Sequence, residues 1–218
     1  NFRKTHRRKK QFTTLFCCML IFNTHSGKAK EKNVCAIKTL SDLKDYAENI
    51  VDETKKSEER STERRKKGDT LAIPYKDLEA FLPEISGYTS EQGPKGSQMN
   101  TPGLGSWSQA EQEYTSGDKR VTVSIMDYNA AHQAFIGLTS MYGLGMSFED
   151  DDKKSGSVDL GVKDVKSYET IYKKDKRSEL VLVVGDRFVI QLNNNGEEGE
   201  NFLRSVAKNM KLGALAEK

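Results

Sequence analysis

Alternation of apolar and polar residues is clearest in two parts of the second half of the chain. Between residues 120 and 128, apolar side chains occur at every second position after a turn that contains glycine. Residues 180–184 (LVLVV) and 187–192 (RFVIQL) flank Gly185 and Asp186, and glycine adopts the positive φ of a two-residue hairpin turn. The pattern predicts two β-hairpins. The second lies in the middle of a sheet, because its strands are apolar on both faces or nearly so.

Helical spacing of apolar residues appears in three further segments. Residues 71–83 contain a short amphipathic stretch that ends at a proline, and residues 197–211 have an apolar stripe with acids early, lysines late and Gly213 as a stop. Residues 130–144 lie within 128–148, a stretch of 21 residues without a charge. Its three glycines and its polar side chains favour a helix buried against the sheet over a membrane span.

These elements predict an α+β fold. We add a strand over 165–172 and one or two twisted strands over 84–106. The expected architecture is an antiparallel sheet of about five to seven strands with helices packed on one face. We place this domain at residues 69–218.

The N-terminal segment has the layout of a secretory signal peptide. Residues 3–10 are strongly basic, and residues 12–22 (FTTLFCCMLIF) are apolar at nine of eleven positions. As a helix the apolar stretch reaches only about 16 Å, short of a hydrocarbon core of about 30 Å. We expect residues 1–29 to be a signal peptide of an exported protein of the bacterial periplasm or cell envelope; a transit peptide and a buried strand are the alternatives. Cys18 stands at lipobox distance from Leu15, which makes lipid attachment there a second route to the membrane.

Residues 30–68 form a charged segment between leader and domain. Apolar residues recur at helical spacing over 36–51, whereas residues 55–67 (KKSEERSTERRKK) hold seven basic residues, three acidic residues and no hydrophobe. Because such a sequence cannot fill a core, we interpret 30–68 as a charged helical stalk. The alternative is a helix folded back on the domain through the apolar face of 36–51.

The distribution of charge bears on the partners. The chain has a net charge of +3, but residues 1–32 alone carry +8, so the rest carries −5. A nucleic-acid-binding domain needs its lysines and arginines on the folded surface. We therefore expect no nucleic-acid partner; binding through the basic N-terminus in the cytoplasm would require that the leader is retained.

Residue types that carry catalysis or metal binding are few. His132 lies in the uncharged segment, and Cys35 has no partner once the leader is removed. The acidic run 149–152 does not continue as a calcium loop, because Lys154 and Ser155 stand where an oxygen ligand and glycine are needed. Neither a phosphate-binding glycine loop nor a Gly-x-Ser-x-Gly turn occurs in the sequence. We predict no enzymatic activity, no metal site and no cofactor.

An apolar contact surface is the remaining candidate site. The uncharged stretch offers more apolar side chains than one buried helical stripe needs, and aromatic anchors carry much of the energy of interfaces. The candidate partner-contact residues are Trp107, Phe135, Leu138, Met141 and Tyr142. Complete coverage of these side chains by the sheet and a neighbouring loop is the alternative.

Three segments carry a resemblance. Residues 75–87 (YKDLEAFLPEISG), 106–127 (SWSQAEQEYTSGDKRVTVSIMD) and 173–192 (KKDKRSELVLVVGDRFVIQL) resemble uncharacterised bacterial exported proteins and lipoproteins. The order of elements over about 70–215 is also similar to PsbP-like α+β domains. The resemblance implies an exported α+β domain and brings no established activity or site residues.

Taken together, the sequence predicts a non-catalytic envelope protein, a binding or adaptor module on a charged stalk. Its partner would be an envelope protein or a small ligand. It would be attached to a membrane only through the leader or a lipid anchor. The alternative is a domain in the same compartment that binds a small ligand or uses carboxylates for hydrolysis.

Overall fold

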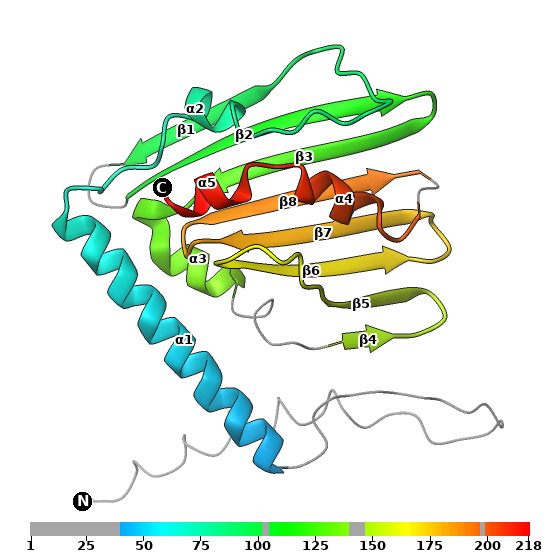
Figure 1. Cartoon of the computed structure of the whole chain (residues 1–218). Coiled ribbons are helices and arrows are strands. Elements are labelled where there is room, and N and C mark those ends of the chain that lie inside the picture. Colours follow the sequence, from blue (N-terminus) through cyan, green and yellow to red (C-terminus); the bar gives the residue numbers. More distant parts are fainter. Residues whose placement is uncertain (1–39, 102–104, 140–146, 197–198) are drawn as a thin grey trace, which may run out of the picture. The chain divides into compact units, whose positions relative to one another are not determined.

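The protein is an α+β domain built on one antiparallel sheet. Its structure, a computed structural model, describes residues 40–101, 105–139, 147–196 and 199–218. In this part of the chain the strand order is β1-β2-β3-β8-β7-β6-β5-β4, with every neighbouring pair antiparallel (Figure 1). The strands are β1 (Lys95–Thr101), β2 (Gly105–Ser116), β3 (Lys119–Asp127), β4 (Ser147–Glu149), β5 (Lys153–Ser157), β6 (Val165–Tyr172), β7 (Arg177–Val184) and β8 (Phe188–Asn195).

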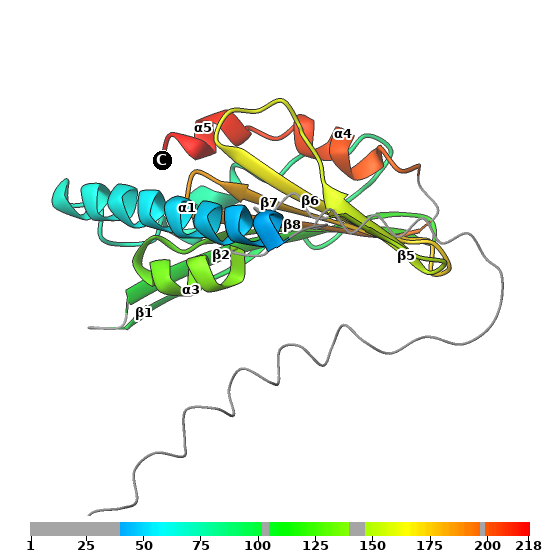
Figure 2. The ribbon, with the colours of Figure 1, turned by 90° about the horizontal axis from the view of Figure 1, so that it is seen from below.

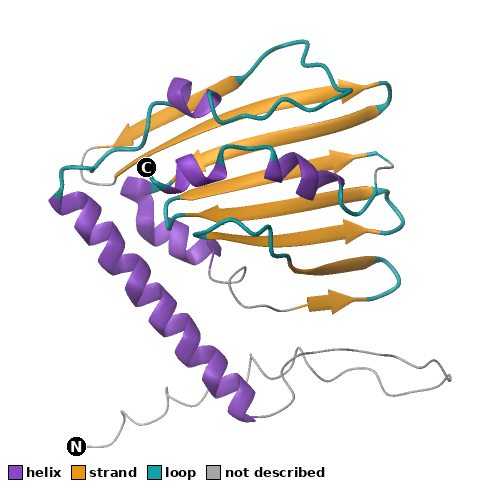
Figure 3. Cartoon of the chain, in the orientation of Figure 1, coloured by secondary structure: helices purple, strands orange, loops and turns teal. Residues whose placement is uncertain are grey.

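Short helices surround this sheet, together with one long helix (Figure 3). They are α1 (Leu40–Lys66), α2 (Tyr75–Glu79), the 3-10 turn η1 (Asn129–Ala131), α3 (His132–Thr139), α4 (Phe202–Lys208) and α5 (Leu212–Ala216). Over the described residues, no helix is both long enough and apolar enough to cross a membrane.

The α+β class and the antiparallel sheet are confirmed, but the sheet has eight strands rather than five to seven. The sequence pattern does not predict β4 and β5, which lie on either side of the acidic run 149–152, with Glu149 at the end of β4. β4 is exposed along its length, and β5 buries only Ser155. A strand without a buried face has no alternating pattern to detect.

The two predicted hairpins are present, and β7 and β8 lie in the middle of the sheet as expected. The second turn has positive φ at Gly185 (61°) and at Asp186 (57°). Val184 pairs with Phe188, so the connection contains three residues rather than two. The third is Arg187, whose side chain is directed into the protein, where it is almost fully buried.

Helices cover both faces of the sheet rather than one (Figure 2). The main core lies between one face and α2, α4 and α5, and includes Leu78, Phe188 and Leu203. A smaller core, made of Phe135, Val183 and Val189, lies on the opposite face under α3. The prediction of one covered face was wrong because β7 and β8 are apolar on both sides, and the second side also needs a cover.

Helix boundaries also differ from the expected ones. The C-terminal helix predicted over 197–211 is α4, and the predicted stop Gly213 lies inside a second helix, α5. Of the helix predicted over 130–144, η1 and α3 account for the part up to Thr139, and residues 140–146 lie outside the described residues.

Candidate ligand cavity

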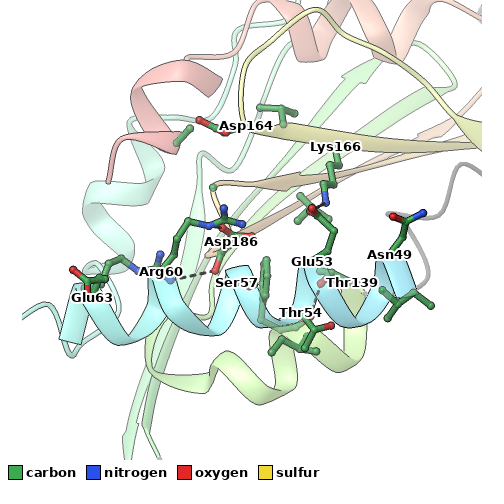
Figure 4. Close-up of a pocket in the computed structure, with 18 of the residues that line it drawn as sticks. Asn49, Glu53, Thr54, Ser57, Arg60, Glu63, Thr139, Asp164, Lys166 and Asp186 are labelled. Carbon is green, nitrogen blue, oxygen red and sulfur yellow. Dashed lines mark hydrogen bonds and ion pairs between the residues drawn. The ribbon is translucent and has the colours of Figure 1, made fainter. Parts of the chain in front are cut away.

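The long helix α1 lies against the domain at one end of the sheet, beside α3, the start of β6 and the β7–β8 turn (Figures 1 and 4). The α1 residues that are buried there are two small polar ones, Ser57 and Ser61. Val51, in contrast, is 65% exposed. The charged second half of α1 thus provides these buried polar contacts. Of the apolar face over 36–51, the structure describes the side chains of Ala47 and Val51, which are exposed, and of Ile50, which is partly buried, so packing through that face stays a prediction.

Two ion pairs join α1 to the strand ends. Lys166 at the start of β6 pairs with Glu53 at 2.6 Å, and Asp186 in the β7–β8 turn pairs with Arg60. The hydrogen bond from Lys166 lowers the pKa of Glu53, and the hydrogen bond to Asp186 raises the pKa of Arg60. Because most of these side chains are about half exposed, each pair stabilises the contact by at most about 1 kcal/mol.

Arg64 makes the deeper polar contact of α1. Its Nε donates to Oδ1 of the buried Asn129 at 3.2 Å, and its Nη2 donates to the main-chain oxygen of Asp186 at 3.2 Å. Burial, together with the neighbouring Arg187, lowers the pKa of Arg64. Arg64 therefore fixes the C-terminal end of α1 to η1 and to the turn at the same time.

A buried serine–histidine contact lies between α1 and α3. Ser57 Oγ is 3.4 Å from His132 Nε2, and the His132 ring stacks on Phe135 with 5.8 Å between centroids. Nδ1 of His132 is buried, and among the described residues it has no hydrogen-bond partner. Burial, and then Arg64, lower the pKa of His132, so the ring is neutral at neutral pH. Within the described part of the chain, therefore, no group orients Nδ1 as the third member of a catalytic triad would.

A cavity of about 920 Å³ lies between α1 and the domain. α1 forms one wall, and the other walls come from α3, the start of β6, the β7–β8 turn and the end of α5 (Figure 4). The apolar lining consists of Ile50, Phe135, Ile136, Val165, Val183 and Ala216. Hydroxyl groups are supplied by Thr54, Ser57 and Thr139.

The charges that line the cavity balance. Four are cationic and four are anionic: Arg60, Arg64, Lys67 and Lys166, and Glu53, Glu63, Asp164 and Asp186. Each of the four acids lies within 4 Å of a basic side chain, in the pairs Glu53–Lys166, Arg60–Asp186, Glu63–Lys66 and Lys163–Asp164. The lining therefore combines an apolar surface with charges that balance in number, and two of its four cations, Arg60 and Lys166, are paired with acids of the same lining.

A second polar cluster, next to this end of the sheet, is structural. Arg187 donates to both carboxylate oxygens of Asp127, at 3.0 and 2.8 Å, to Asp69 at 2.8 Å and to the main-chain oxygen of Lys218 at 2.7 Å. Asp127 also accepts the main-chain N–H groups of Ile73 and Asn129. The cluster therefore connects four parts of the chain: the segment of Asp69 and Ile73, the end of β3, the start of β8 and the C-terminal Lys218. Its guanidinium and carboxylate groups are all engaged.

Of the five predicted partner-contact residues, the structure describes Trp107, Phe135 and Leu138. Phe135 is 2% exposed and lines the cavity, while Leu138 on the same helix is 37% exposed. Trp107 is half-buried on β2, opposite Met99 of β1, and is not part of the cavity lining. Met141 and Tyr142 lie outside the described residues. A contact surface formed by all five stays a prediction.

The acidic run is held by neighbouring lysines. Lys173 pairs with Glu149 at 3.0 Å, Lys174 pairs with Asp152, and Asp150 accepts the main-chain N–H groups of Asp152 and Lys153. Those two hydrogen bonds lower the pKa of Asp150. Within the described ranges, no group of three or more histidine, cysteine or acidic side chains is placed to hold a metal ion.

Comparison with protein-family models, with curated proteins and with solved structures gives no match. The function is therefore inferred from the geometry of the cavity.

Proposed function

We propose that this protein is a non-catalytic binding module that takes a small, uncharged, amphipathic molecule into the cavity between α1 and the domain. The observation that carries the proposal is the combination of an apolar lining with equal numbers of cationic and anionic side chains, two of each joined in ion pairs. The cavity of about 920 Å³ falls in the range of about 300–1,000 Å³ that accommodates small ligands.

The lining also indicates what the ligand is not. A phosphate or carboxylate ligand requires cations that are free to form charge-assisted hydrogen bonds. Here Lys166 and Arg60 are paired with acids of the protein, and Arg64 donates to Asn129. The fourth lining cation, Lys67, is exposed to solvent, where a charge contributes little to binding. An apolar body with one or two hydroxyl or carbonyl groups would lie on the aliphatic side chains and bond to the hydroxyls of Thr54 and Ser57.

The proposed setting is the bacterial envelope. The basic and apolar layout of residues 1–29 supports export, and Cys18 is the proposed site of a lipid anchor. In this proposal, residues 30–68 do more than hold the domain away from the exit site, because α1 forms a wall of the binding cavity.

Titration with Nile red, an uncharged solvatochromic dye, tests the proposal. We expect a saturable fluorescence increase with the whole chain. Thr54 lines the cavity, and Thr62 is an exposed residue two turns further along the same helix. Thr54→Trp should fill the cavity and weaken dye binding at least about tenfold, whereas the matched Thr62→Trp should leave binding unchanged. Unsaturable binding to the wild type, or equal effects of the two variants, would refute the proposal.

A further inference from the structure

The outer edge of β1 is open. β1 is the first strand of the sheet order, and no described strand pairs with its outer side. Residues 95–100 are all exposed. The strand (KGSQMNT) carries one charge, on Lys95, and its main-chain groups on the outer side are available to a further strand.

The usual protection of a sheet edge is confined to one end of β1, where Lys95 follows Pro94. Natural edge strands carry charges or proline within the strand, or contain a bulge that twists the edge away. β1 pairs with β2 without interruption over seven residues, from Lys95↔Glu111 to Thr101↔Gly105. From Gly96 to Thr101 the strand contains neither a charged residue nor a proline.

The strand is complementary to itself. In an antiparallel pair of two β1 strands that overlaps all seven residues, Gln98 lies on the two-fold axis and faces its own copy. Ser97 then faces Met99 of the other copy, and Lys95 faces Thr101. Because Lys95 lies at one end of the strand, the two lysines are separated by about 20 Å, the length of six residues of strand, and do not repel strongly.

The same register covers an exposed apolar side chain. Met99 is 51% exposed and lies opposite Trp107 of β2, so both project from the same face of the sheet. In the symmetric pair the two Met99 side chains are diagonal neighbours, about 7–8 Å apart, within reach of long side chains. Pairing thus brings two methionines together between two half-buried tryptophans.

The opposite face of β1 is already occupied within the chain. A Cβ atom at Gly96 would lie 2.2 Å from Cδ2 of Tyr75, so the ring of Tyr75 from α2 rests directly on Gly96. A partner strand would therefore meet α2 on one face of the sheet, while on the other face the described residues leave Met99 half exposed.

From these observations we infer that two copies of this chain associate through β1, so that one antiparallel sheet continues across a two-fold axis at Gln98. The occupant of the edge is a second copy because the register that pairs all seven residues produces no like-charge contact and covers Met99. A contact between two strands of seven residues is small compared with most specific interfaces, so we expect weak association, with a dissociation constant in the micromolar range.

Analytical ultracentrifugation of the full chain tests the inference. We expect a reversible monomer–dimer equilibrium in the wild type. Gln98→Lys and Gln98→Glu each place like charges opposite each other at the axis and should weaken the dimer by at least about tenfold. An equimolar mixture of these two variants should dimerise again, because lysine then faces glutamate. Asn193→Lys, which adds the same charge at an exposed position of the central strand β8, should leave the dimer unchanged.

A monomeric wild type, a dimer that survives Gln98→Lys, or a mixture that does not recover would each overturn the inference. The mixture also separates self-association from capture of an unrelated extended peptide, since only a contact between two copies of β1 is restored by opposite charges at one position.

Discussion

Replacing Arg187 with methionine removes the guanidinium that pairs with Asp127 inside the protein. The Arg187 side chain is 4% exposed and that of Asp127 has no exposed surface, so water cannot take over the lost contacts. Methionine keeps much of the volume of the side chain, so the change isolates the loss of charge and hydrogen bonds. Asp127 would keep its two main-chain donors and lose two charge-assisted hydrogen bonds, and the bonds from Arg187 to Asp69 and Lys218 would also be lost.

The expected loss of stability is large. Removal of one partner from a buried ion pair costs about 3–5 kcal/mol, because the other charge remains buried without compensation. For a domain of this size, about 1 kcal/mol corresponds to about 2–4 °C, so the melting temperature should fall by roughly 6–20 °C.

Thermal unfolding followed by circular dichroism measures the effect. Arg120→Met is the matched control, because Arg120 on β3 pairs with Glu113 at 3.4 Å and both side chains are more than half exposed. The control should change the free energy of unfolding by less than about 1 kcal/mol. If Arg187→Met destabilises no more than Arg120→Met, the buried pair does not hold these segments together.

Three further predictions concern the turn, a buried phenol and the α1 contact. Gly185→Val should lower the free energy of unfolding by about 1–3 kcal/mol, because valine resists a φ of 61° and its Cβ would lie 3.0 Å from the main-chain oxygen of Ala216. An unchanged midpoint of urea unfolding would show that the turn tolerates valine. Burial raises the pKa of Tyr114 to about 12, so its stabilising effect is complete below pH 10 and is lost as the pH rises through 12. Tyr114→Phe should therefore remove a step near pH 12 from the ultraviolet titration of the tyrosines. If the variant instead lacks a step near pH 10, burial of Tyr114 is contradicted. Raising the salt concentration to about 1 M should accelerate amide hydrogen exchange in α1 but not in β8, because the α1 ion pairs are largely exposed; equal protection at both salt concentrations would contradict a polar contact.

The sequence predicts the elements that bury one clear face. Alternation at Val121, Val123 and Ile125 identifies β3, and the apolar runs on each side of Gly185 identify β7 and β8. β4 and β5 lack that signal because they bury almost nothing. The helix α3 was predicted, and its position on the second face could have been anticipated as well. Val181 and Val183 project away from the main core, so that face also needs a cover.

The cavity could not be predicted because its contacts join distant parts of the chain through polar residues. Glu53 and Lys166 are 113 positions apart, and Ser57 and His132 are 75 apart. A charged helix indicates exposure to solvent, and nothing in its periodicity shows which serines are covered. Asp127 and Arg187, the two members of the buried ion pair, are 60 positions apart, and no pattern in the sequence pairs them.

The most direct test of the ligand cavity is a nuclear magnetic resonance titration of the whole chain with Nile red, in which the amide signals show where the dye binds. The account predicts one saturable set of shifts at the cavity walls, represented by Thr54, Ile136, Val165 and Gly185. Shifts confined to strand residues outside the cavity lining, for example Thr170 and Asn193, or an absence of saturable shifts, would contradict it.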